Sequence, residues 1–225
     1  MDSTTAAYKR LKIAIVILCV AIMVVIVGVI GVFAAPSQSI NSSFNIEYSV
    51  GGNIAAKVKT QHTVGATTIV ATKDASGNVI TDKDGYVVFN ASDTSASKVV
   101  AIGDIPIDPK NTEVEMMFTF ENISDSNDFY ILFQENISNV KNVKITVSSI
   151  KTPSADTSSW ADASAWTEEA EIENVTTTNW YNVTTLGAGL KTAYKVKIKV
   201  DNVNWSASCT GGFSLLLSEE DPVVA

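Results

Sequence analysis

Apolar and polar residues alternate with a period of two along four stretches of this chain. In the first, Phe44, Ile46, Tyr48 and Val50 are separated by polar residues, and the other three cover residues 114–120, 143–147 and 194–200. Successive side chains of a β-strand point to opposite faces, so each stretch places one apolar row on a core and one polar row in water. The pattern predicts four half-buried strands.

Shorter apolar runs predict further strands. They cover residues 69–71, 86–89, 99–102, 129–133 and 213–217. Asp and Gly within residues 73–78 and 82–85 predict two hairpin loops, and Pro106 marks a connection between strands. Only residues 158–173 favour a helical turn or two. We expect nine or ten strands and an all-β fold: an antiparallel, jelly-roll-like β-sandwich formed by residues 35–225.

A hydrophobic helix is predicted to precede this domain. No charged residue interrupts the 22 residues from Ile13 to Ala34, and as a helix they would span roughly 33 Å, about the thickness of a bilayer core. Residues 1–12 form a basic region containing Lys9, Arg10 and Lys12. Because cationic flanks stay in the cytoplasm, the rest of the chain is expected outside the cell or on its surface.

Two interpretations of this segment stay open. The small residues Ala34 and Ala35 suit signal peptidase, so cleavage between them would release a secreted chain. The apolar run is also longer than the roughly 7–15 residues of an ordinary signal core, which suits a single-pass anchor bound to the membrane through residues 13–34. Either form exports the domain.

Charge and cysteine content limit the partners and roles that the exported part can have. The chain has a formal net charge of −8, and without Asp2 and the three bases before the apolar run it carries 13 bases and 23 acids. An acidic domain lacks the cationic face that phosphate backbones require, so we expect no nucleic-acid partner. Cys209 is alone in the exported part and is expected to be a small buried side chain.

Candidate catalytic and metal-binding residues are few. His62 is the only histidine and has no zinc-hydrolase motif around it, so we expect no enzyme, no catalytic residue and no cofactor. Asp82 and Asp84 lie beside Gly85 as in a calcium loop, but the other EF-hand ligand positions hold Ile80 and Ala91. A hairpin turn is the better interpretation, with a looser calcium site as the alternative.

Three further patterns concern the surface. Lys195, Lys197 and Lys199 share one strand face, either as a solvated, edge-protecting row or as a site for an anionic polymer. The acidic run 168–173 is interpreted as a solvated charge cluster. Trp160 and Trp166 flank a polar loop and are candidates for a contact surface. Seven Asn-x-Ser/Thr sequons, including those at Asn90 and Asn122, would accept glycans in a host that glycosylates exported proteins.

The chain resembles the TasA/camelysin-like exported proteins of Gram-positive bacteria, whose leader is handled by a SipW-type peptidase. The resemblance rests on the leader followed at once by strand 43–48, on the stretch 102–109 leading into Phe-Thr-Phe-Glu-Asn-Ile-Ser at 118–124, and on residues 194–201 with Gly-Phe-Ser-Leu at 212–215. It implies a jelly roll, and in some members fibres that assemble when each subunit donates an N-terminal strand to the next. It also implies a metalloprotease activity for camelysin, which this chain lacks the histidines to perform.

These observations together predict an exported, non-enzymatic structural protein of the cell surface or extracellular matrix. The apolar row of Phe44, Ile46, Tyr48 and Val50 is the candidate donor strand, since an open sheet edge accepts an extended segment whose alternate side chains fill core positions. The same strand could equally pair within its own domain. Self-association into fibres or binding to another surface protein is therefore expected. The alternatives are a membrane-anchored adhesin or binding module and a pilin-like filament subunit.

Overall fold

The computed structural model describes residues 38–40, 44–93, 96–107, 111–135, 137–171, 180–200 and 208–220. These residues are mostly β-strand, in predominantly antiparallel sheets. None of the helices among them is long and apolar enough to cross a membrane. The predicted leader 13–34 and the cleavage position between Ala34 and Ala35 lie outside the described residues.

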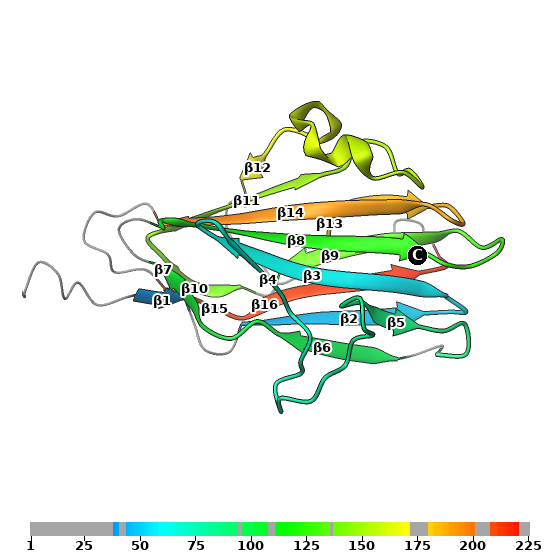
Figure 1. The fold of residues 1–225 in the computed structure, drawn as a ribbon, viewed down its shortest axis with the longest axis horizontal. Coiled ribbons are helices and arrows are strands. Elements are labelled where there is room, and N and C mark those ends of the chain that lie inside the picture. Colours follow the sequence, from blue (N-terminus) through cyan, green and yellow to red (C-terminus); the bar gives the residue numbers. More distant parts are fainter. Residues whose placement is uncertain are drawn as a thin grey trace, which may run out of the picture. The chain divides into compact units, whose positions relative to one another are not determined.

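Seven strands form the larger sheet, in the order β12-β11-β14-β8-β3-β4, with β5 also paired to β3 (Figure 1). Their bounds are β3 Ala56–Val64, β4 Thr67–Val70, β5 Val87–Phe89, β8 Glu113–Asn122, β11 Val143–Ser149, β12 Ala170–Glu171 and β14 Lys191–Val200. The two ten-residue strands β8 and β14 pair over nine positions at its centre. This sheet provides the face on which the candidate site is built.

Five strands form the smaller sheet, in the order β13-β9-β16-β2-β6. Their bounds are β2 Asn45–Gly51, β6 Ser97–Ala101, β9 Phe129–Glu135, β13 Trp180–Leu186 and β16 Gly212–Ser218. The pair β2–β16 is parallel, whereas every other pair of named strands described is antiparallel. The first strand of this sheet in the sequence, β2, therefore lies beside β16, the last strand described, and runs in the same direction.

Two short antiparallel pairs and one excursion complete the described structure. The pairs are β1 Gln38–Ile40 with β7 Ile105–Ile107, and β10 Ser138–Lys141 with β15 Ser208–Thr210. The excursion leads from β11 to β12 and contains two 3-10 turns, η1 Ser158–Ala161 and η2 Ala163–Ala165. We call residues 152–171 the strap; in Figure 1 it stands above β11 and β14.

The two large sheets face each other across one core. Phe118 of β8 packs edge-on against Phe213 of β16, with ring centroids 5.7 Å apart, and Phe120 meets Tyr48 of β2 at 6.2 Å. The apolar rows of both sheets belong to a single buried cluster. Burial of these rows is the main force holding the layers together, because each large aromatic side chain removes a large apolar area from water.

The strands read from the sequence are confirmed, but the described residues contain sixteen strands where nine or ten were expected, because several are short or carry no apolar alternation. All four alternating stretches lie in strands (β2, β8, β11 and β14), and the five apolar runs overlap β4, β5, β6, β9 and β16. The two hairpin loops and the helical turns within 158–173 are present.

One long central strand, β3, has no such signal. Its inward row includes Thr60 and His62, which are 2% and 7% exposed, so polar residues stand where alternation predicts apolar ones. The antiparallel neighbours β8 and β4 supply the hydrogen bonds that make this segment a strand.

Candidate functional site

The strap follows the edge of β11 and returns along it. Thr167 N donates to the carbonyl of Ser149 at 2.8 Å, and Lys151 N donates to the carbonyl of Ala165 at 2.9 Å. Farther along, Glu171 and Ala170 of β12 pair with Thr146 and Val147. The strap is thus an extra edge segment of the larger sheet, and it lies beside the outer, polar face of β14.

A small hydrophobic cluster anchors the strap. Ile150, Trp166 and Ala193 are buried there, with Trp160 partly buried against them. Trp166 is only 7% exposed, and its indole N–H donates to the carbonyl of Trp160 at 2.9 Å. The two tryptophans predicted as contact-surface candidates therefore pack together and hold the strap against the sheet.

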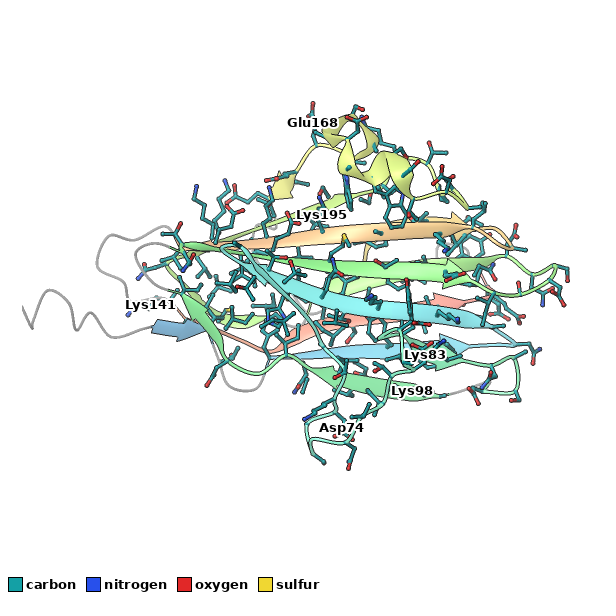
Figure 2. The ribbon with its side chains drawn as sticks, viewed as in Figure 1. Asp74, Lys83, Lys98, Lys141, Glu168 and Lys195 are labelled. Atoms are coloured by element: carbon teal, nitrogen blue, oxygen red, sulfur yellow. The ribbon has the colours of Figure 1, made fainter. Side chains whose placement is uncertain are left out.

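Lysines cover the sheet face beside this cluster. Lys195, Lys197 and Lys199 occupy alternate positions of β14, and Lys144 of β11 lies directly opposite Lys199. The Lys195 ammonium is 4.1 Å from the centre of the Trp166 ring and 3.8 Å from a carboxylate oxygen of Glu115. In Figure 2, Glu168 stands on the strap and Lys195 lies on the strand beneath it. We call Lys144, Lys195, Lys197 and Lys199 the lysine face.

Two glutamates of the strap reach the lysine face. Glu169 forms an ion pair with Lys197, and Glu171 forms one with Lys144. The hydrogen bond from Lys197 lowers the pKa of the Glu169 carboxyl below its ordinary value, and the same bond raises the pKa of Lys197. Both groups therefore stay charged over a wider pH range than they would in isolation.

Glu169 and Lys197 line two open hollows. The first, of about 320 Å³, is lined by Trp166, Lys195 and Lys197 among others; the second, of about 260 Å³, is lined by Lys144, Lys197, Lys199 and Glu113. The two hollows offer ammonium groups beside an aromatic ring, and the carboxylates of Glu113, Glu115, Glu168 and Glu169 also line them. Their chemistry suits binding of carboxylates, because exposed lysines act as point charges with flexible stems.

The remaining candidate residues lie elsewhere. Asp82 uses one carboxylate oxygen to accept hydrogen bonds from the backbone N–H groups of Asp84 and Tyr86, each at 2.9 Å, so it closes its own hairpin. Nowhere in the described part of the chain could three or more His, Cys, Asp or Glu side chains together hold a metal ion. Cys209 is fully buried, as expected, and burial raises the pKa of its thiol to about 11.

The candidate donor strand lies inside the smaller sheet. Phe44, Ile46 and Tyr48 have no exposed surface, and Val50 is 4% exposed. This strand fills an interior position of its own sheet, between β16 and β6. Its apolar row thus occupies core positions of the kind that a donated strand would fill.

Sequence reasoning treated the lysine row and the acidic run as two separate solvated features. The structure brings parts of them together: Glu169 of the strap pairs with Lys197 of β14, and Glu171 pairs with Lys144 of the neighbouring strand β11. The available signal was the opposite charge of two segments that each carry charged residues at alternate positions, which in strands lie on one face.

Comparison with known proteins found no matching family model and no matching curated protein.

Proposed function

We propose that this protein is an exported, non-enzymatic structural protein of the cell surface or extracellular matrix. In this proposal the two facing sheets are a jelly-roll-like β-sandwich, and residues 13–34 form the hydrophobic helix that exports it. The leader pattern of a basic region before 22 uncharged residues supports export. The resemblance to TasA/camelysin-like proteins supports the structural role.

The position of β2 is the observation that carries the assembly part of the proposal. This strand comes first among those of the two large sheets, yet it occupies an interior position between β16 and the edge strand β6. Its removal would open a groove with unpaired backbone groups on both sides, and the β2 of a neighbouring copy has the side chains to fill that groove. Gly51 is the last residue of β2 and Gly52 follows it with φ +109°, a backbone conformation that glycine adopts readily and other residues rarely do.

Disulfide trapping tests whether β2 crosses between copies. Ser49 and Leu216 are partners in the parallel β2–β16 register, so cysteines there lie near enough to bond. S49C protein and L216C protein are mixed in denaturant, refolded together and oxidised. Strand donation predicts a covalent S49C–L216C pair between chains. A strand retained in its own domain predicts no such pair, and a closed bond within each chain of the S49C/L216C double variant.

A matched control uses two neighbouring strands that the proposal keeps within one chain. Thr146 of β11 and Lys197 of β14 are also register partners. A mixture of T146C and K197C proteins is expected to give no cross-link between chains.

Export itself is tested by measuring the intact mass of the protein from the producing cell. A chain that starts at Ala35 is a secreted subunit, whereas a chain that retains Met1 in the membrane fraction is an anchored one. Full-length chain in the cytosol would contradict export.

A further inference from the structure

The lysine face contains a repulsive arrangement within its own sheet. Lys144 and Lys199 are direct cross-strand partners on β11 and β14, and like charges in that position destabilise a sheet. Lys197 lies two residues from Lys199 on the same face. An acidic chain of net charge −8 therefore gathers four cations on one small surface.

The strap shows which chemistry relieves this repulsion. Its residues 170 and 171 are extended and paired to β11, and the carboxylates of Glu169 and Glu171 are two residues apart. In an extended chain that separation is roughly 6.6–6.8 Å, the same repeat as the lysines of β14. The carboxylates pair with Lys197 and Lys144, one on each of two neighbouring strands.

Charge on the face depends on whether the strap occupies it. Four lysines face Glu113 and Glu115 of β8 and Glu168, Glu169 and Glu171 of the strap, a formal charge of −1 with the strap seated and +2 without its three glutamates. Lys199 is exposed and forms no ion pair with a described residue. The ion pairs of the strap are solvent-exposed, so each holds it weakly.

We propose that the lysine face binds, in trans, an extended acidic polypeptide with carboxylates at alternate residues, and that the strap is its competitor in cis. The four lysines supply the charge complementarity, and the strand repeat supplies the spacing. Repulsion from the rest of this acidic protein is largely screened beyond about 8 Å at physiological salt, so contact with the face decides binding. This inference is independent of strand donation by β2.

Two peptides of equal composition and charge test the spacing. The probes are fluorescent (Glu-Thr)₆ and (Glu-Glu-Thr-Thr)₃, titrated with the full-length chain in detergent and followed by anisotropy at low and physiological salt. The alternating peptide is expected to bind more tightly, because only its carboxylates all lie on one face of an extended chain. Equal affinities for the two peptides would overturn the proposal.

Two double variants test the surface. Neutralising the strap in E169Q/E171Q should tighten binding of the alternating peptide roughly three- to tenfold, as two competing surface ion pairs would give. The variant K197Q/K199Q should weaken it by a similar factor. The control K73Q/K83Q removes two lysines of the hairpin loops with the same change in net charge, and should alter binding by less than about twofold.

Each remaining result is decisive. A loss in K73Q/K83Q equal to that in K197Q/K199Q would mean that net charge alone acts, and would overturn the proposal. Tighter binding of polygalacturonate than of the alternating peptide would assign the face to a polysaccharide and overturn it as well. Were K197Q/K199Q to misfold, as judged by circular dichroism, an unchanged affinity in folded E169Q/E171Q would still refute competition by the strap.

Discussion

At the scale of single residues, the buried side-chain amide of Asn122 connects several backbone segments through hydrogen bonds. Its Nδ2 group donates to the carbonyls of Asn127 and Leu186, both at 2.8 Å, and its Oδ1 accepts from the backbone N–H and the hydroxyl of Ser124. The side chain is 1% exposed, although the sequence presents it as one of seven sequons. Asn90 stands in the same kind of Asn-x-Ser motif, so only the structure distinguishes the buried asparagine from the exposed one.

Replacement of Asn122 by alanine should destabilise the protein by about 2–3 kcal/mol, because it leaves buried backbone groups without partners. Asn90 is exposed, and the matched variant N90A should change stability by less than about 0.5 kcal/mol. Urea unfolding followed by circular dichroism measures both. Equal effects at the two positions would refute the structural role assigned to Asn122.

His62 is a second residue whose role depends on burial. Its side chain faces inward, where the alternation of a strand predicts an apolar group. Burial lowers its pKa below the ordinary value, and its Nδ1 atom has no hydrogen-bond partner among the described residues. Its cross-strand partners are Met116 and Ile69, neither of which titrates. The neutral imidazole is therefore the form that the fold favours.

Stability should consequently fall as the pH drops below about 6.5, the ordinary pKa of an unfolded histidine. Below that pH the unfolded chain binds a proton that the folded protein resists, so acid favours unfolding until the folded His62 also titrates. In H62Q this fall should be absent between about pH 6.5 and 5. Denaturant midpoints measured across that range test it, and parallel curves for the two proteins would contradict the assignment.

At the scale of elements, the parallel β2–β16 pair depends on close backbone approach. A Cβ atom at Gly212 would lie well inside van der Waals contact with the backbone of Asn45, the residue paired with it in β2. The backbone cannot move aside as a flexible side chain can. Glycine is thus required at the position where the last strand begins beside the first strand of its sheet.

The variant G212A should lose about 3 kcal/mol of stability and loosen β2, whereas G77A should lose only about 1 kcal/mol. Gly77 has φ +85° in a hairpin loop, and nothing lies within 4 Å of the added Cβ. The variant G77A therefore measures the cost of the backbone conformation alone, without a steric clash. Thermal unfolding gives the stabilities, and hydrogen exchange of residues 45–51 reports on β2. Unaltered exchange in G212A would contradict this account of the pair.

The sequence predicted most of the longer strands, but it did not predict which strands pair with one another in the sheets. Alternation identified β2, β8, β11 and β14, because a half-buried strand has apolar residues on one face and polar residues on the other, which alternate in the sequence. It missed β3, whose inward Thr60 and His62 are satisfied or sheltered only by residues of other elements. Strand order and the β2–β16 pairing are contacts between distant segments, which a local period does not encode.

For the molecule as a whole, polar bridges cross the otherwise apolar core between the two sheets. The hydroxyl of Tyr48 in β2 shares a hydrogen bond with that of Thr60 in β3, and Tyr194 of β14 donates to Thr184 of β13 at 3.0 Å. Burial raises the pKa of Tyr48 far above its ordinary range and that of Tyr194 to about 12, so both phenols stay neutral. These bridges fix how one sheet is placed on the other.

Removal of both partners of the buried bridge should cost less than the sum of the two single removals. Y48F should destabilise the protein by about 1–2 kcal/mol, because it leaves the Thr60 hydroxyl unpaired, while Y48F/T60V should cost less than the sum of the two single variants. Chemical denaturation of the four proteins completes the cycle. Strict additivity would mean that the hydroxyls do not interact in solution.

By itself, the sequence determined the all-β class, most of the strands, the hairpin turns and the expectation of an exported acidic domain, because each of these depends on neighbouring residues. Only the tertiary structure decided that Glu169 and Glu171 pair with the lysine face, that Trp166 of the strap is buried against the sheet, and that Asn122 is an internal bridge rather than an accessible sequon. Those outcomes depend on segments far apart in the chain, whose meeting is set by packing of the sheets and not by any local pattern.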